Sequence, residues 1–168
     1  MVSRGRLAIG LTRPVLAHEA LDLKSLKLRD ETLCAVVPAT HPLAAQRSLP
    51  WARLAKEPVI LLARREGAGS HDAILAACQQ AGFTPRIAHT PSLIGTILQY
   101  VEAGAGIGIV PESVLPLDPG LKLLPLTPRH TIPLVMVWAK DGDDPPVVAF
   151  RELVTNWLRS GRLWQAEA

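Results

Sequence analysis

Short apolar runs alternate along the chain with segments whose apolar residues recur at helical spacing. The runs have the length and composition of β-strands, and they read RLAIGL, DETLCAVVP, PVILLA, PRIAH, IGIV, LKLLPL and IPLVMVWA. A polar connection through residue 26 separates the first two. Helices are expected at residues 71–81, at residues 93–101 and around residues 148–157. This order of strands and helices predicts an α/β fold.

The stretch QYVEAGAGIGIVPESV holds three glycines, Gly104, Gly106 and Gly108. A glycine loop that binds a dinucleotide follows a strand and opens a helix, whereas here the helix comes first and a short strand follows. Nucleotide binding is therefore disfavoured. We expect Gly104 to end the helix in a left-handed conformation, and Gly106 and Gly108 to let the strand pass close to another backbone.

Charge and hydropathy exclude several classes of protein. The 168 residues include 18 Lys and Arg against 15 Asp and Glu, and the resulting net charge of +3 is too small to argue for nucleic-acid binding. No apolar run approaches the roughly twenty residues that span a bilayer, so we expect a soluble protein without a membrane partner. The N-terminal residues make a poor signal peptide, which indicates the cytoplasm.

The residues capable of metal or covalent chemistry are scattered. Cys34 and Cys78 lie in an apolar strand and on an apolar helix face, and we interpret both as buried small residues rather than a disulfide. The five histidines show no spacing typical of a metal site. No acid and base converge in the sequence, so we expect no catalysis, no metal and no cofactor.

Three phrases, GRLAIGLTRP, LRDETLCAVVPATHPLA and EAGAGIGIVPES, together resemble the effector-binding domain of LysR-type transcriptional regulators in order and spacing. Within that family, the sequence most resembles the regulators of aromatic-compound degradation, which respond to muconate, benzoate or chlorocatechol. The resemblance implies the periplasmic-binding-protein-like type II fold, with one complete lobe plus a partial second lobe. It assigns residues 1–168 to this domain, residues 32–126 to the complete lobe, and residues 1–31 and 127–168 to the partial one.

Family members begin with a winged helix-turn-helix, and no such segment precedes Met1. We therefore expect contact with DNA only through a helix-turn-helix domain absent from this chain. Half of one lobe is also missing from the expected pattern. Its remaining apolar faces lack cover, which favours self-association into a homo-oligomer.

The loop ARREGAGSHDA is the strongest candidate for an anion site. A glycine-rich loop that opens a helix offers free N–H groups and the positive end of the helix dipole. Arg64 and Arg65 add positive charge, and Gly69 and Ser70 are expected to donate hydrogen bonds, with Ser70 as the helix cap. The resemblance implies that this loop faces the cleft between the lobes. An ordinary solvated turn remains an alternative.

Two further residues enter through the resemblance. Arg13 follows the first strand, at a place where regulators of aromatic-compound breakdown use an arginine to bind a dicarboxylate, and its fork of donors suits a carboxylate. A surface arginine is the alternative. Thr131 lies near the second crossover and would line the hinge.

These observations favour a ligand-sensing module that binds a small carboxylate or aromatic-acid effector in the interlobe cleft and so regulates transcription. A free solute-binding protein or a small enzyme on the same lobe architecture is the alternative. The missing export signal disfavours a free solute-binding protein, and the missing acid–base pair disfavours an enzyme.

Overall fold

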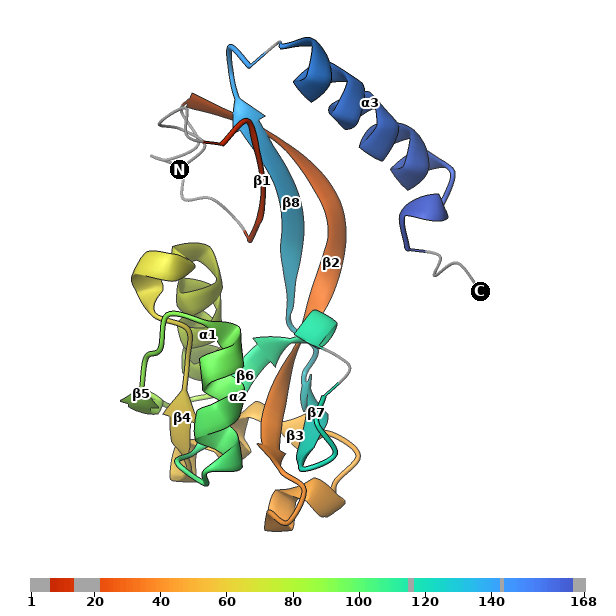
Figure 1. The fold of residues 1–168 in the computed structure, drawn as a ribbon. Helices are drawn as coiled ribbons and strands as arrows, with labels where there is room; N and C mark the ends of the chain where they lie inside the picture. The colour runs from red at the N-terminus through yellow and green to blue at the C-terminus, as the bar shows by residue number, and fades with distance from the viewer. Residues whose placement is uncertain (1–6, 14–21, 115–116, 143, 165–168) are drawn as a thin grey trace.

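The computed structural model describes residues 7–13, 22–114, 117–142 and 144–164. Two parts are stacked along one long strand, β2 (Leu23–Pro38) (Figure 1). We call residues 7–13, 22–32, 131–142 and 144–164 the upper part, and residues 33–114 and 117–130 the lower part. The strands of both parts form one hydrogen-bonded network because β2 runs through each of them.

Strand β2 changes its partners halfway. Its first part, up to Thr32, pairs antiparallel with β8 (Thr131–Ala139), and its second part, from Leu33 on, pairs antiparallel with β6 (Ile107–Pro111) and β7 (Leu121–Thr127). The sequence predicted a strand only from residue 30 on, after a polar connection through residue 26, and this was wrong. Pairing with β8 extends the strand back to Leu23 despite its polar side chains.

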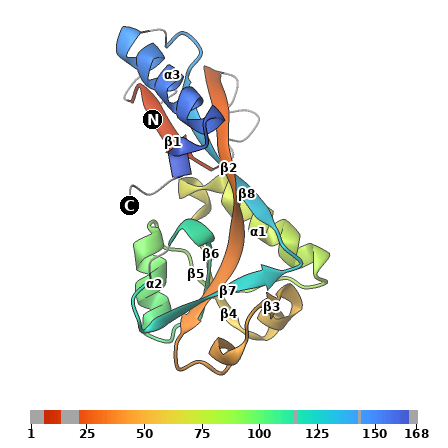
Figure 2. The same cartoon turned by 90° about the vertical axis from the view of Figure 1, so that its right-hand side faces the viewer.

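The upper part is a small sheet with one helix on it. Strand β1 (Ile9–Thr12) pairs antiparallel with β8, and α3 (Pro145–Arg159) lies against one face, the face turned toward the viewer in Figure 2. Its core consists of Leu28, Met136, Trp138, Val147 and Val154. The Arg151 guanidinium lies 4.5 Å from the centre of the Trp138 ring, so the helix also contacts the sheet through a cation–π interaction.

The lower part is a mixed sheet with a helix on each face (Figures 1 and 2). Strands β4 (Pro58–Ile60), β5 (Arg86–His89) and β6 are parallel, and β3 (Leu49–Pro50) pairs with β7. Helix α1 (Ala68–Gln80) packs on one face through Ile74 and Cys78, and α2 (Ile94–Glu102) packs on the other through Ile97 and Val101. Short 3-10 helices lie at Pro42–Ala45, Trp51–Lys56, Arg64–Glu66, Glu112–Val114 and Arg162–Trp164.

The glycine-rich stretch that leads into β6 is architectural, as predicted. Gly104 ends α2 with φ +75°. A Cβ on Gly106, whose φ is +155°, would lie 2.5 Å from the carbonyl oxygen of Pro58, and a Cβ on Gly108 would lie 2.7 Å from the Ile97 side chain. The glycines therefore let β6 pass close to β4 and α2, and a side chain at either later position would force the elements apart.

The two cysteines are buried and unpaired, as predicted from their apolar surroundings. Burial raises the pKa of each thiol to about 11. The negative charge of the Glu112 carboxylate also raises the pKa of Cys34. Both side chains therefore contribute to the lower core as small apolar residues.

Candidate functional site

A cavity of about 260 Å³ lies where the upper and lower parts meet. Its walls come from the end of β1, the first turns of α1 and α2, strand β6 and the crossover residues of β2 and β8. Most of the lining is apolar, and it consists of Leu11, Leu33, Leu62, Ile74, Ile94, Ile97, Ile109, Val110, Pro111 and Ile132. Four residues, Thr12, Arg13, Ser70 and His71, bring polar groups to it. An apolar chamber with a few placed polar groups is typical of a small-molecule site.

Helix α1 directs its N-terminus to this cavity. The helix begins at Ala68, with Gly67 as its cap, so the prediction of a start at residue 71 with Ser70 as the cap was wrong. The first helical hydrogen bond runs from the His71 N–H to the Gly67 carbonyl (2.9 Å). By helix geometry the N–H groups of Ala68, Gly69 and Ser70 precede this bond and have no carbonyl partner within the helix.

The Ser70 hydroxyl is buried without a partner. Ser70 is 9% exposed, and its Oγ makes no hydrogen bond in the described part of the chain. A buried hydroxyl without a hydrogen bond costs free energy, which a ligand oxygen in the cavity would recover. Since Ser70 is not used as a helix cap, its side chain is free for that role.

His71 follows on the same turn and is also buried. Its Nδ1 lies 3.0 Å from the carbonyl oxygen of Leu62. Since a carbonyl only accepts hydrogen bonds, this contact places a proton on Nδ1 and fixes the ring orientation at the cavity wall.

Arg13 enters the cavity from the end of β1, where it is held by two partners. Its Nη2 forms an ion pair with Glu31 and donates a hydrogen bond to the hydroxyl of Ser113 (3.3 Å). Burial lowers the pKa of Arg13, the Glu31 charge opposes that shift, and Arg29 adds to it. Ser113 belongs to the lower part, so Arg13 joins the two parts at the cavity.

Glu31 lies beneath Arg13 on β2 and is fully buried. Arg29, two residues earlier on the same face of the strand, donates to Glu31 Oε1 through Nε (3.0 Å) and Nη2 (2.6 Å). A buried carboxylate is stable only with charged or hydrogen-bonding partners, and the two arginines supply them. Sequence analysis did not identify Glu31, although the Arg-x-Glu spacing, which places both residues on one strand face, was a usable signal.

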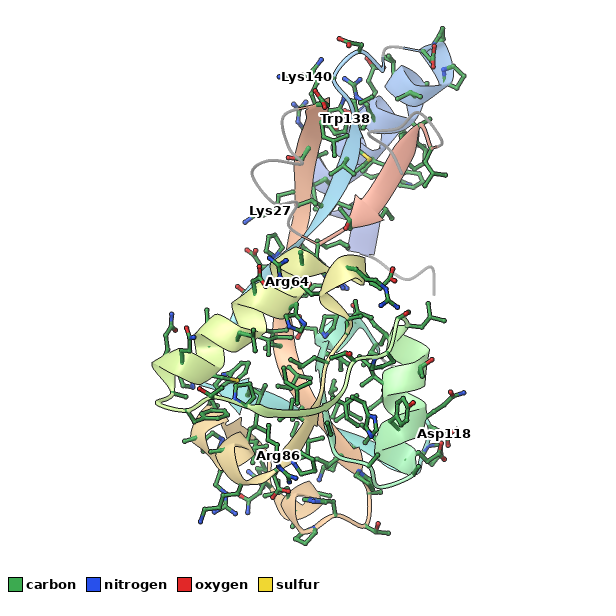
Figure 3. The ribbon with its side chains drawn as sticks, turned by 90° about the vertical axis from the view of Figure 1, so that its left-hand side faces the viewer. Lys27, Arg64, Arg86, Asp118, Trp138 and Lys140 are labelled. Carbon is green, nitrogen blue, oxygen red and sulfur yellow. The ribbon has the colours of Figure 1, made fainter. Side chains whose placement is uncertain are left out.

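The structure does not bring the other predicted site residues to the cavity wall. Arg64, in the exposed 3-10 turn before α1, forms a bidentate pair with Asp72 of α1 (2.8 Å for both bonds), and Figure 3 shows it close to the junction. Arg65 contacts Glu66 and donates to the Ser92 hydroxyl (2.7 Å). Gly69 lies in the first turn of α1, and Thr131 pairs with Thr32 at the crossover. Of the six predicted residues, Arg13 and Ser70 therefore share the cavity.

Neither a metal site nor a membrane span is found in the described segments. No group of three His, Cys, Asp or Glu side chains within them could hold an ion. None of the helices they form has the length and apolar character needed to cross a bilayer.

Comparison with known sequences identifies a family of regulators. Residues 1–159 match the profile of the LysR substrate binding domain. The HTH-type transcriptional regulator TtuA of Agrobacterium vitis is 35% identical over 149 residues, which cover 84% of this chain and 48% of that protein. YnfL of Escherichia coli, an uncharacterized HTH-type transcriptional regulator, is 30% identical over 158 residues, which cover 92% of this chain and 52% of that protein. The chain thus spans about half the length of these curated relatives.

Solved structures share the fold. The effector-binding domain of QuiR, in complex with shikimate, superposes with a TM-score of 0.83 at 20% identity over 96% of this chain and 77% of that one. The BenM effector-binding domain with its effector benzoate gives a TM-score of 0.75 at 21% identity over 99% and 78%. The architecture is therefore that of the periplasmic-binding-protein-like type II fold, as predicted.

Proposed function

Because the chain belongs to the LysR substrate-binding-domain family, whose members are transcriptional regulators rather than enzymes, we propose that its cavity senses a small carboxylate or aromatic acid. The bound acid would alter how the upper and lower parts sit against one another, and so regulate transcription. Family membership argues against the small enzyme and the free solute-binding protein considered from sequence. The side chains that line the cavity would determine which effector binds.

One observation supports an acid as the ligand. The cavity combines the guanidinium of Arg13 with the unpartnered hydroxyl of Ser70, and its remaining lining is mostly apolar. A guanidinium and a hydroxyl at the end of a helix suit a carboxylate, and the apolar walls suit a hydrocarbon body. Arg64, Arg65 and Gly69, predicted from the glycine-rich loop, and Thr131, predicted from the resemblance, lie outside the cavity wall, so the proposal rests on Arg13 and Ser70.

The ligands named for two relatives of the fold agree with this chemistry. QuiR was solved with shikimate and BenM with benzoate, and each is a carboxylate on a six-membered carbon ring. We use these compounds as probes for the present chain.

Calorimetric titration of the chain with benzoate, shikimate and sulfate tests the proposal. We expect benzoate or shikimate to bind, and Arg13→Ala to weaken binding by about 1.5–3 kcal/mol because a hydrogen bond to a charged group is lost. Arg86→Ala is the matched control, since Arg86 is exposed on β5 in the lower part, away from the junction (Figure 3). Equal loss in both variants, or no binding by the wild type, would overturn the proposal.

The division into lobes is part of the same proposal. Residues 32–126 would form the complete lobe, with residues 1–31 and 127–168 in the partial one. The change of partners along β2 between Thr32 and Leu33 supports this boundary. Contact with DNA would be made by a helix-turn-helix domain, as the names of the curated relatives indicate, and the site of action would be the cytoplasm.

A second copy of the chain is the partner we propose for α3. Phe150, Leu153 and Trp157 recur at helical spacing and are 46%, 42% and 41% exposed, while the helix turns Val147 and Val154 to its own core. Exposed apolar stripes are commonly covered by association. Light scattering at tens of micromolar should give a dimer that Trp157→Lys converts to monomer. A wild-type monomer would contradict this part of the proposal.

A further inference from the structure

We propose that Glu31 sets the charge selectivity of the cavity, so that the preferred acid carries a single carboxylate. This inference rests on the proposed function and narrows its ligand class. It also departs from the dicarboxylate that the resemblance implied for Arg13.

The ion pair of Arg13 with Glu31 is complete before a ligand arrives. The Glu31 side chain is 0% exposed and that of Arg13 is 21% exposed, so the carboxylate lies behind the guanidinium as seen from the cavity. The Nη2 group of Arg13 is shared between Glu31 and the Ser113 hydroxyl. Arg29 donates to the same carboxylate, so Arg13, Arg29 and Glu31 together carry one net positive charge, which a single ligand carboxylate balances.

In the part of the chain that the structure describes, no second lysine or arginine lines the cavity to compensate another charge. Among the described residues at its wall, Arg13 is the single lysine or arginine, and the polar groups beside it are Thr12, Ser70 and His71. A first carboxylate can reach Arg13 and Ser70. A second carboxylate on the same ligand would face apolar side chains and the field of Glu31, and an unpaired charge in such surroundings is strongly unfavourable.

The selectivity of this cavity is therefore attributed to Glu31 rather than to the shape of the walls. If Glu31 were neutral, each negative charge on the ligand would lose one repulsion. A dicarboxylate would lose two, whereas a monocarboxylate would lose one. The change in the ratio of the monocarboxylate and dicarboxylate affinities when Glu31 is neutralised therefore measures the effect of the Glu31 charge, because the packing of the ligand body stays the same.

Calorimetry with 4-methylbenzoate and terephthalate provides the test, because these acids differ mainly by one carboxylate in place of a methyl group. We expect the wild-type chain to bind 4-methylbenzoate at least about tenfold more tightly than terephthalate. Glu31→Gln keeps the length of the side chain and an acceptor for Arg13. It should lower this ratio about tenfold, with terephthalate gaining the larger improvement.

Two controls separate charge from structure. Glu31→Asp keeps the negative charge and should keep the preference for the monocarboxylate, while Glu152→Gln removes an exposed charge on α3 and should leave both affinities unchanged. Thermal melting establishes that each variant is folded. If Glu31→Gln does not fold, equal binding of the two acids by the wild type still overturns the inference.

The outcomes distinguish this inference from the proposed function. If both acids bind the wild type equally well and both depend on Arg13, the role of Glu31 is overturned while the acid site stands. If Glu31→Gln leaves the affinity ratio unchanged, the role of Glu31 is likewise overturned while the acid site stands. If neither acid binds the wild type, the proposed function fails and this inference fails with it.

Discussion

Replacing Ser70 with alanine should stabilise the free protein and weaken its ligand binding at the same time. The Ser70 hydroxyl is buried without a hydrogen bond, an arrangement that costs about 1–3 kcal/mol. Alanine removes that group and has a higher helix propensity by roughly 0.5 kcal/mol. We therefore expect the free energy of unfolding to rise by about 1 kcal/mol.

The effect on binding should have the opposite sign. A neutral hydrogen bond contributes about 0.5–1.5 kcal/mol, so Ser70→Ala should weaken benzoate binding about two- to tenfold. Buried polar groups at binding sites commonly show this exchange of stability for function.

Urea denaturation and thermal melting measure the first effect, and calorimetry measures the second. For a chain of this size, 1 kcal/mol corresponds to a rise of about 2–4 °C in Tm. Ser160→Ala is the control, because Ser160 is an exposed serine whose hydroxyl donates to the Trp157 carbonyl (3.2 Å). It should change the free energy of unfolding by no more than about 0.5 kcal/mol and leave the affinity unchanged. A destabilised Ser70→Ala variant with unaltered affinity would refute the assignment of this hydroxyl to the ligand.

Three further outcomes follow from the fold and the site. Gly106→Ala should lower the free energy of unfolding by about 3 kcal/mol in urea denaturation, because the added Cβ would meet a backbone carbonyl. Gly104→Ala has open space around the added Cβ and should cost about 1 kcal/mol. Equal losses in the two variants would contradict the close approach of β6. Cys34 and Cys78 should resist iodoacetamide at pH 8 until urea is added. Because burial raises each pKa from 9.0 to about 11, the unfolded chain loses these protons first, and stability should fall as the pH rises from 9 through 11. Arg64→Ala should leave benzoate affinity unchanged, since its guanidinium pairs with Asp72 at the surface, and a tenfold loss would return this loop to the site.

Local patterns were enough to predict most of the lower part. Its strands and helices follow apolar runs and helical spacing, and the glycines before β6 were interpreted correctly because helix-then-strand order excludes a nucleotide loop. The start of β2 was missed because the strand depends on pairing with β8, more than a hundred residues away. Pairing between such distant segments leaves no local signal in a polar sequence.

The site was predictable only in part, for the same reason. Arg13 and Ser70 were identified from the resemblance and from the glycine-rich loop, but the loop also suggested Arg64 and Arg65, whose nearest carboxylates pair with them instead. Gly67 caps α1 three residues ahead of Ser70, and this small shift frees the hydroxyl that the sequence had assigned to capping. The burial of Glu31 depends on Arg13, which β1 and β8 bring beside it.

A crystal structure of the chain soaked with 4-methylbenzoate tests the acid site most directly. We expect the ligand carboxylate within hydrogen-bond distance of the Arg13 guanidinium and the Ser70 hydroxyl, with the ring against the apolar wall formed by Ile74, Ile97 and Ile109. A cavity without ligand under conditions in which calorimetry detects binding, or a carboxylate seated instead against Arg64 or Arg65 on the exposed loop, would contradict the assignment of this cavity as the effector site.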